Sequence, residues 1–360
     1  MATLDLSNLT INPKEADAFG KFVMERTFMR PELKSIHKVI TGVKMKEQIV
    51  LASQMGLAGK LANGCNAVSS GAGSVLTQKY WEPASIEDTI DTCVKSQNGM
   101  FKAYFDKVTR YKETYDFTGS DEELFVLALI EDAVKATMHR AIWFGDKTVA
   151  NATSSAAGLI PVSPTNTWAF NYFDGLWKQA FTAVGGGTLE RVTITENTPT
   201  GSPKAIPAMT AANAYGYIKS VYEAADPRLR NDLEAQILVD GQTFMGYVNY
   251  LVDKGTHYDI DYTRDGLQSV KFMGHNVVNM ETVWDANNVY FEDNTVNQLP
   301  NLPYRIFFAA PSNIPVATLA EEDFGEIESW YDRGDKTNHT RFGFTLDAKL
   351  VDNSLAVVAY

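Results

Sequence analysis

Cysteine is almost absent from this sequence, which contains only Cys65 and Cys93 among its 360 residues. A small secreted scaffold held together by disulfides would need more of them. We therefore expect two reduced thiols in a protein made in a cytoplasm. The chain also starts without a basic region followed by an apolar one, so no secretory signal is predicted.

Long apolar runs and an excess of basic residues are missing as well. The longest apolar run, 124–130, is far shorter than a bilayer span, and no membrane association is expected. The net charge is −12, whereas proteins that grip DNA through its phosphates carry a basic surface. The chain is thus not predicted to read DNA sequence, although it could enclose DNA, because a container need not bind its contents tightly.

The overall composition is typical of a well-packed protein, since 45% of the residues are hydrophobic and 21% are charged. From about 151 to 335, helical and strand patterns alternate, which predicts an α+β or mixed domain with a central sheet. Helices are predicted to begin near Asp174, at Thr210 and at Gln242. The predicted strands are 189–194, 235–239, 270–278, 288–291 and 304–309, followed by two strictly alternating ones, 342–350 and 355–359.

Residues 41–82 form the least usual segment. Residues 44–57 fit either a strand or a helix, and the glycines at 56, 59, 64, 71 and 73 follow closely. A loop this long is uncommon inside a compact domain and is usually functional or flexible. Residues 1–40 before it are predicted as an extended arm with a short helix within 13–29, and strands are predicted at 86–95 and 100–117 after it.

The clearest single element is a long helix. Ser120 fits its N-cap and Glu123 its third position, which together form the capping-box pattern. Apolar residues then recur at helical spacing as far as Ile142, and Gly145 stands where many helices end in a left-handed glycine. The pattern predicts a helix of more than twenty residues.

Motifs for nucleotide binding and for metal ligation are not found. The run 56–61 has the wrong spacing for a phosphate-binding loop and lacks its Ser or Thr. No histidine lies three or four residues from another, so metal ligation is not predicted for any of the five: His37, His139, His257, His275 and His339.

The acidic clusters and aromatic pairs have structural explanations too. One cluster stands beside Gly266 and fits a hairpin turn: Asp259, Asp261 and Asp265. A second lacks the glycine of a calcium loop and fits a polar turn: Asp285, Asn287 and Asp293. Two aromatic pairs fit buried packing or interface anchoring: Trp143–Phe144 and Trp330–Tyr331. No catalytic, cofactor-binding or metal site is therefore expected, and the chain is not predicted to be an enzyme.

Four short segments carry a resemblance to a known family. They are 141–146 (Ala-Ile-Trp-Phe-Gly-Asp), 173–179 (Phe-Asp-Gly-Leu-Trp-Lys-Gln), 309–314 (Ala-Ala-Pro-Ser-Asn-Ile) and 344–349 (Phe-Thr-Leu-Asp-Ala-Lys). Together with the arm, the glycine-rich loop and the long helix that precede them, they resemble the capsid fold of tailed phages, which is named after phage Hong Kong 97. The resemblance covers nearly the whole chain.

This resemblance implies a division of the chain. The N-terminal arm would be 1–40 and the extended E-loop 41–85. The P-domain with its spine helix would be 86–165, the A-domain at the capsomer centre 166–335, and the closing P-domain strands 336–360.

The resemblance also implies a function. A major capsid protein of this kind self-assembles into hexamers and pentamers of an icosahedral or prolate shell, which encloses double-stranded DNA without binding its sequence. The implied partners are further copies of the chain, a portal protein, scaffolding, and decoration or head-completion proteins. The implied location is the virion capsid, assembled in the cytoplasm of a host bacterium, and no cofactor is implied.

One departure and two alternatives stay open. Some members of the family begin with a long scaffolding region, and this sequence departs from them because its arm begins near Met1. The departure implies a separate scaffolding protein, no scaffolding at all, or prior processing.

Some relatives cross-link a lysine to an asparagine of another subunit, and the loop region offers Lys46, Lys60 and Lys79 for this. The alternatives are an encapsulin, which is a cargo-holding bacterial shell of the same fold, and an α/β enzyme with an unrecognised site. Gene neighbourhood would test the first, and a convergent polar cluster the second.

Overall fold

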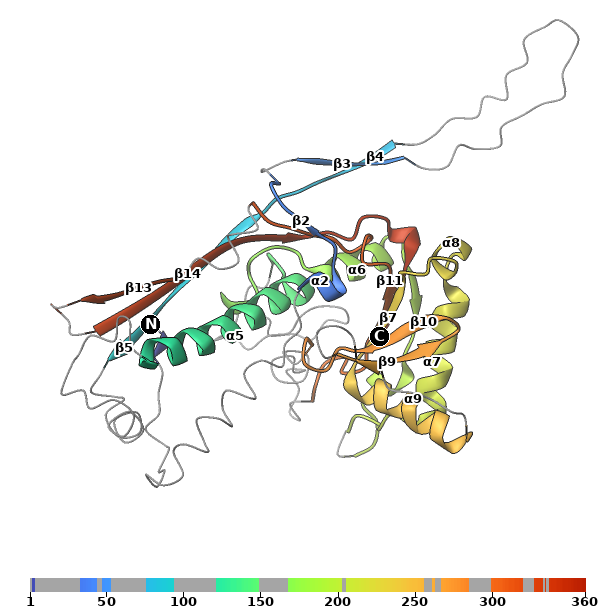
Figure 1. Ribbon diagram of the computed structural model, residues 1–360. Coiled ribbons are helices and arrows are strands. Elements are labelled where there is room, and N and C mark those ends of the chain that lie inside the picture. The colour runs from blue at the N-terminus through green and yellow to red at the C-terminus, as the bar shows by residue number, and fades with distance from the viewer. Residues whose placement is uncertain are drawn as a thin grey trace, which may run out of the picture.

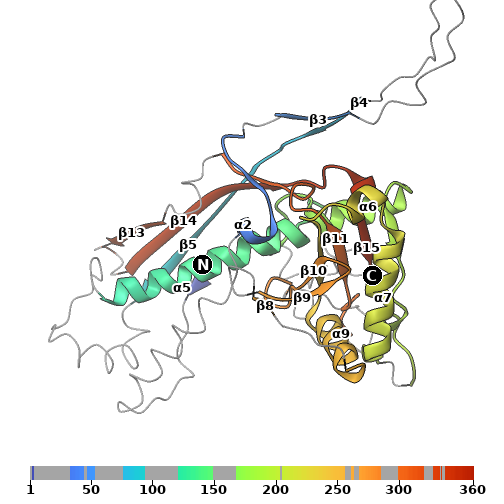
Figure 2. The same ribbon diagram turned by 45° about the vertical axis from the view of Figure 1, so that its right-hand side comes forward.

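Two sheets, one long helix and a projecting ribbon organise the chain (Figure 1). The structure is a computed structural model. It describes residues 2–3, 33–43, 47–52, 76–93, 121–148, 168–202, 205–255, 261–262, 267–284, 299–319, 327–332, 334 and 337–360. An elongated part with long strands lies on one side, and a lobe of mixed helices and strands on the other (Figures 1 and 2).

The first sheet gives the elongated part its length. Its strand order is β1 (Ala2–Thr3), β5 (Ala84–Cys93), β14 (Thr337–Ala348), β12 (Val316–Ala317) and β2 (Val39–Ile40), and β13 (Ile327–Asp332) also pairs with β14. The two longest strands, β5 and β14, run antiparallel from the pair Cys93–Thr337 to the pair Ala84–Leu346. The predicted strand at 86–95 is confirmed, and so is the alternation that starts at Phe342.

The long helix α5 (Asp121–Phe144) runs beside this sheet (Figure 2). Its inner residues Val134 and Met138 are buried in one cluster with Phe342 and Phe344 of β14. The predicted helix is therefore confirmed. Ser120 lies outside the described residues, so the capping box stays a prediction.

The second sheet forms the core of the mixed lobe. Its order is β6 (Glu190–Val192), β15 (Ala356–Ala359), β11 (Ile306–Ala309), β7 (Gln236–Val239), β10 (His275–Asn279), β9 (Gln268–Phe272) and β8 (Asp261–Tyr262). All four residues of β11 and of β15 are buried. The strand predicted at 355–359 is confirmed, but its burial does not follow the predicted alternation, because both faces of the sheet are covered. The last residues of the chain thus leave the first sheet at β14 and enter the second at β15.

Helices cover the two faces of this sheet. They are α6 (Leu176–Gly185), α7 (Ala211–Ala224), α8 (Pro227–Arg230) and α9 (Gly241–Asp253), with α2 (Leu33–Ile36) and the 3-10 turns η2 (Thr195–Asn197) and η4 (Asn353–Leu355) elsewhere. The predicted cap of α7 is confirmed, since the Thr210 side chain accepts a hydrogen bond from the Asn213 N–H. Gly255, with φ of +62°, follows α9 as predicted.

One predicted strand is in fact a hairpin. The pattern at 270–278 was consistent with a single strand, but the chain turns at Met273 and Gly274, whose φ angles are +48° and +92°. Strands β9 and β10 pair on either side of this turn. Positive φ at both central residues is typical of a tight hairpin turn. Methionine is a rare choice there, which is why the sequence did not indicate it. Residues 44–57, left as strand or helix, contain the strand β3 (Gln48–Ala52).

Several predictions fall outside the described residues. These are the helix within 13–29, the glycine-rich loop, the strands at 100–117 and 288–291, and the turn at Asp265–Gly266. The domain boundaries also stay predictions.

Where α5 ends, its backbone touches the segment that leads into α6. The Gly175 N–H donates to the Gly145 carbonyl at 2.8 Å. Gly145 follows the helix as predicted, but the predicted reason is wrong, because its φ is not in the left-handed region. A Cβ atom at Gly145 would lie 2.3 Å from the Phe173 carbonyl oxygen. Glycine is needed here for the close approach of two backbones.

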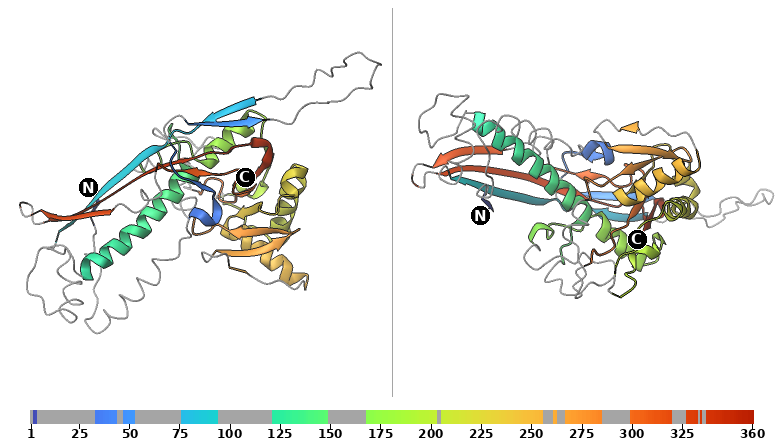
Figure 3. Two further views of the ribbon diagram at one scale, coloured as in Figure 1. Left: turned by 45° about the horizontal axis from the view of Figure 1, so that its top comes forward. Right: turned by 90° about the horizontal axis from the view of Figure 1, so that it is seen from below.

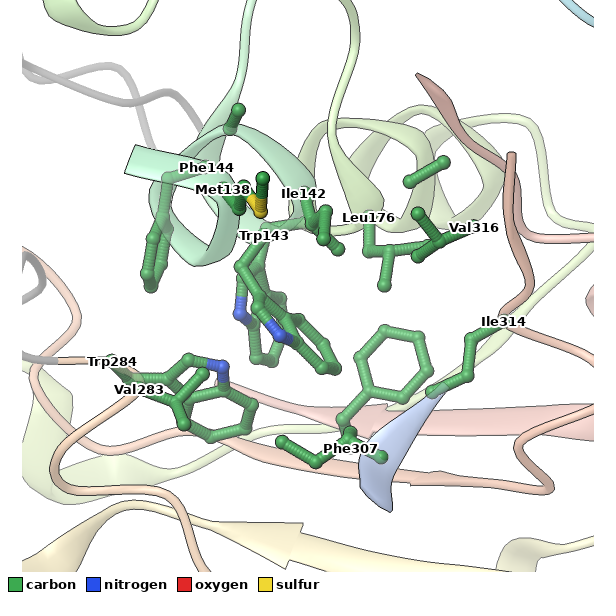
Figure 4. Packing of buried hydrophobic residues seen from close by; sticks show 14 of the residues in the cluster. Met138, Ile142, Trp143, Phe144, Leu176, Val283, Trp284, Phe307, Ile314 and Val316 are labelled. Carbon is green, nitrogen blue, oxygen red and sulfur yellow. The ribbon is translucent and has the colours of Figure 1, made fainter. Parts of the chain in front are cut away.

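An aromatic cluster that includes Trp143, Trp284 and Phe307 lies at the end of α5 (Figure 4). Trp143 of α5 meets Trp284 and Phe307 edge-on, with ring centroids 5.1 and 5.5 Å apart. Trp177 of α6 contacts the same Phe307 at 5.4 Å. All four side chains are fully buried or nearly so. The cluster therefore connects the long helix to the second sheet. It also confirms buried packing for Trp143 and Phe144.

His37 closes this core from the side of α2. Its Nδ1 donates to the Ile314 carbonyl at 2.9 Å, and its ring lies 5.3 Å from Trp143. Burial lowers the pKa of His37 to about 3, and the nearby His139 adds to this effect. The folded protein therefore excludes the charged form.

We expect this histidine to make the protein acid-sensitive. Above pH 6.5 the imidazole is neutral in both states, so its contribution to stability is fully present. As the pH falls from there towards about 3, His37 is protonated in the unfolded chain but stays neutral in the folded protein. The free energy of unfolding should then fall by up to about 1.4 kcal/mol per pH unit. Urea unfolding between pH 7.5 and 4 should show a shallower decline for His37→Gln than for wild type, and equal slopes would contradict the assignment.

Candidate assembly site

A two-stranded ribbon projects from the body of the molecule (Figure 3). It consists of β3 (Gln48–Ala52) and β4 (Leu76–Tyr80), which pair antiparallel from Gln48–Tyr80 to Ala52–Leu76. Strand β4 continues through residues 81–83 into β5 of the first sheet. The ribbon is thus an extension of the longest part of the fold.

The described side chains of the ribbon give it little core of its own. Gln48 and Gln78 are exposed, and the Gln48 amide donates to the Gln78 side-chain oxygen at 2.6 Å. Tyr80 is 47% exposed and donates its hydroxyl to the same oxygen. An isolated two-stranded ribbon is at best marginally stable in water. A ribbon of this kind is suited to being completed by contacts with another molecule.

The ribbon is attached to the body at its base, which we define as residues 79–82 together with 347–353. Trp81 is buried against Val43 and Ala317. The Lys79 ammonium donates to the Leu350 carbonyl and, at 3.1 Å, to the Asn353 side-chain oxygen. These contacts join the ribbon to the stretch that links β14 of the first sheet to β15 of the second.

A buried carboxylate completes the ribbon base. Asp347 is fully buried and accepts a hydrogen bond from the Glu82 N–H at 2.7 Å. Burial raises the pKa of Asp347, while the Lys349 ammonium, 3.3 Å away, and hydrogen bonds from the backbone lower it. Glu82 in turn pairs with Lys147 at 3.0 Å. Because a lone buried charge is costly, these partners are needed to hold the carboxylate in place.

The face of the first sheet that bears His339 is polar. His339 donates to the Asp91 carboxylate at 2.6 Å, and Trp330 stacks on the histidine ring at 5.3 Å. Arg341 pairs with Glu87 on the same face at 2.6 Å. Trp330 is 42% exposed, so buried packing does not explain the presence of tryptophan at this position. The alternative role of Trp330 as an interface anchor stays a prediction. Among the described strands, β13 pairs with β14 alone and therefore presents an open edge.

Within the described part of the chain, no group of three or more His, Cys, Asp or Glu residues could hold a metal ion. His37 and His139 are buried in the core, and His275 lies within hydrogen-bond distance of the Ala235 and Arg230 carbonyls. His257, Asp259 and Asp265 lie outside the described residues, as do Asp285, Asn287 and Asp293. Among the described helices, none is long and apolar enough to cross a membrane.

Of the three lysines considered for cross-linking, the structure describes one. Lys79 bonds within its own subunit, at the ribbon base, while Lys46 and Lys60 lie outside the described residues. Sequence reasoning missed the roles of Asp347 and Asn353, because nothing local shows that they meet a segment more than 250 residues away.

Comparison with known proteins supports the capsid fold. No protein-family model matches the sequence, and no curated protein matches it. Among solved structures, the chain is similar to one from Gordonia phage Cozz, with a TM-score of 0.51 and 9% identity over 92% of this chain and 86% of that chain. It is also similar to the capsid of a native GTA particle, with a TM-score of 0.50 and 11% identity over 100% and 93% of the two chains. For the capsid of an empty GTA particle, the TM-score is 0.50 and the identity 12%, over 100% of this chain and 93% of that chain.

At such low identity these likenesses establish the fold alone. The predicted fold class is confirmed: the chain combines helices and sheets in the arrangement of phage capsid proteins. The assignments of the N-arm, the E-loop and the two domains stay predictions.

Proposed function

We propose that the chain is the major capsid protein of a tailed phage. Its copies would assemble into the hexamers and pentamers of a closed shell around double-stranded DNA. The observation that carries this proposal is the projecting ribbon on a capsid-type fold, because an isolated two-stranded ribbon is at best marginally stable and, among its described side chains, Gln48, Gln78 and Tyr80 are exposed. The role is structural, and no reaction is assigned to the chain.

The charge of the chain supports a container. A wall with a net charge of −12 repels the phosphates of packaged DNA and does not trap them. The remaining proposals follow from the same role. They are a location in the virion after assembly in the host cytoplasm, and contacts with a portal protein, scaffolding, and decoration or head-completion proteins.

Electron microscopy and light scattering of the purified protein test this function. We expect rings or closed particles of regular size, whose abundance rises with protein concentration. A strictly monomeric protein at high concentration would count against a shell subunit. Particles that hold a protein cargo instead of DNA would favour the encapsulin alternative.

A pair of charge substitutions sharpens the test. Tyr80→Asp places a charge on the exposed ribbon, while Leu233→Asp places one on the mixed lobe, where Leu233 is 91% exposed. Both variants should fold like wild type, because neither side chain is buried. We expect at least about a tenfold lower particle yield from Tyr80→Asp alone, since a charge forced into an interface without a partner is strongly unfavourable. Equal yields from both variants would contradict a role for the ribbon in assembly.

A further inference from the structure

We propose that Lys79 is a positioning residue that pins the ribbon to the body and so sets the direction in which it projects. The inference rests on the proposed function only for what the ribbon direction does in a shell. The pin itself is a property of the single subunit. It assigns Lys79 a role within its own chain, in place of the cross-linking considered from the sequence.

The geometry around Lys79 is that of a bridge between distant segments. Its ammonium group donates to the Leu350 carbonyl and to the Asn353 side-chain oxygen, which lie 271 and 274 residues further along the chain. Asn353 is held in turn, because its amide nitrogen donates to Thr188 Oγ1 at 2.9 Å. The segment to which Lys79 binds is therefore fixed to the loop after α6 as well.

The environment of the ammonium strengthens these bonds. The side chain is partly buried, and burial lowers the pKa of Lys79 while the charge of Asp352 raises it. Hydrogen bonds from a charged donor in partly buried surroundings are stronger than those between neutral groups. The neighbouring Lys349 is occupied by Asp347 and does not replace Lys79 at Leu350.

The position of Lys79 in the ribbon makes its bonds effective. It lies beside Ile49 in the ladder, one residue before the end of β4, while Trp81 and Glu82 hold the chain immediately afterwards. The five residues of each ribbon strand span about 17 Å. A rotation of about 10° at the base would move the far end of these strands by about 3 Å, which is enough to break a close-packed contact. A small rotation at the ribbon base therefore causes a large displacement at the far end of the ribbon.

Hydrogen exchange of unassembled subunits tests the pin directly. Lys79→Met keeps the length of the side chain and removes its donors. We expect amide exchange in 76–82 to become about tenfold faster, with α7 unchanged. Lys219→Met is the matched control, because Lys219 is exposed and pairs with Glu223 of the same helix at 3.6 Å. Exchange in 76–82 that equals wild type would overturn the proposal.

Two further variants keep the test decisive. Asn353→Leu removes one of the two acceptors of Lys79 and leaves the bond to the Leu350 carbonyl, so we expect a smaller increase of exchange in the same residues. The double variant should add little to Lys79→Met, because Lys79→Met has already lost both bonds. If Lys79→Met fails to fold, the exchange of Asn353→Leu decides the proposal alone. Additive effects of the two substitutions would overturn it.

Particle size by electron microscopy gives the second readout. We expect wild type to form particles of one size and Lys79→Met to form a broad or aberrant distribution. If wild type forms no particles, the proposed function fails while hydrogen exchange still decides the pin. If particles of Lys79→Met match wild type although exchange has increased, the ribbon direction does not control assembly and that part of the inference is wrong.

Discussion

A Gly145→Ala variant is expected to lose about 3 kcal/mol or more of unfolding free energy. The new Cβ would lie 2.3 Å from the Phe173 carbonyl oxygen and 2.7 Å from that of Ala141. Both atoms belong to the backbone, so neither can move aside as a flexible side chain would. Gly175→Ala should behave alike, because its Cβ would lie 2.7 Å from the Gly145 nitrogen. Relief of the clash with Phe173, or of the one made by Gly175→Ala, requires the end of α5 to separate from the segment that leads into α6.

Gly216 provides the control for this prediction. It lies inside α7, and a Cβ there would meet nothing within 4 Å. Gly216→Ala should stabilise the protein by about 0.5–1 kcal/mol, because alanine loses less backbone entropy in a helix. Urea unfolding followed by circular dichroism would compare the three variants with wild type. A Gly145→Ala protein as stable as wild type would show that the two backbones are not in close contact.

Truncation of Trp143 is expected to be comparably costly. Trp143→Ala should lower the unfolding free energy by about 3–5 kcal/mol, through lost burial and the cavity left behind. The side chain is fully buried and contacts His37, Trp284 and Phe307. Neighbours from so many elements cannot all collapse into the space, because each is held by its own helix or strand.

Trp330 is the matched control, since it is 42% exposed and stacks on the ring of His339. Trp330→Ala should cost about 1 kcal/mol or less. Urea unfolding midpoints, compared at equal slopes, would measure both changes. Similar losses for the two tryptophans would contradict the central position assigned to Trp143.

Much of the secondary structure could be predicted, because its signals are local. The periodicity of α5 and the cap at Thr210 involve residues within one or two turns of each other. The order of elements likewise indicated the capsid fold, although no single motif was specific. The hairpin at Met273–Gly274 was missed, because the apolar pattern continues through the turn and methionine is unusual at positive φ.

The buried polar groups could not have been predicted. Arg305 is fully buried, donates to the Leu302 carbonyl at 2.9 Å, and lies 5.1 Å from the ring of Trp177. Burial lowers the pKa of this guanidinium to about 9. An arginine beside an apolar run usually points to solvent. Only the packing of α6 over β11 shows that this one does not.

The sequence by itself determined the long helix, several strands such as β5, β7 and β11, and the class of fold, because these depend on periodicity and on neighbours along the chain. Tertiary structure decided why Gly145 must be glycine, why β15 is buried on both faces, and which partners Lys79 and Asp347 find. Each of these depends on segments far apart in sequence. Their meeting is set by the packing of whole elements, and the free energy of such contacts leaves no repeating pattern in the chain.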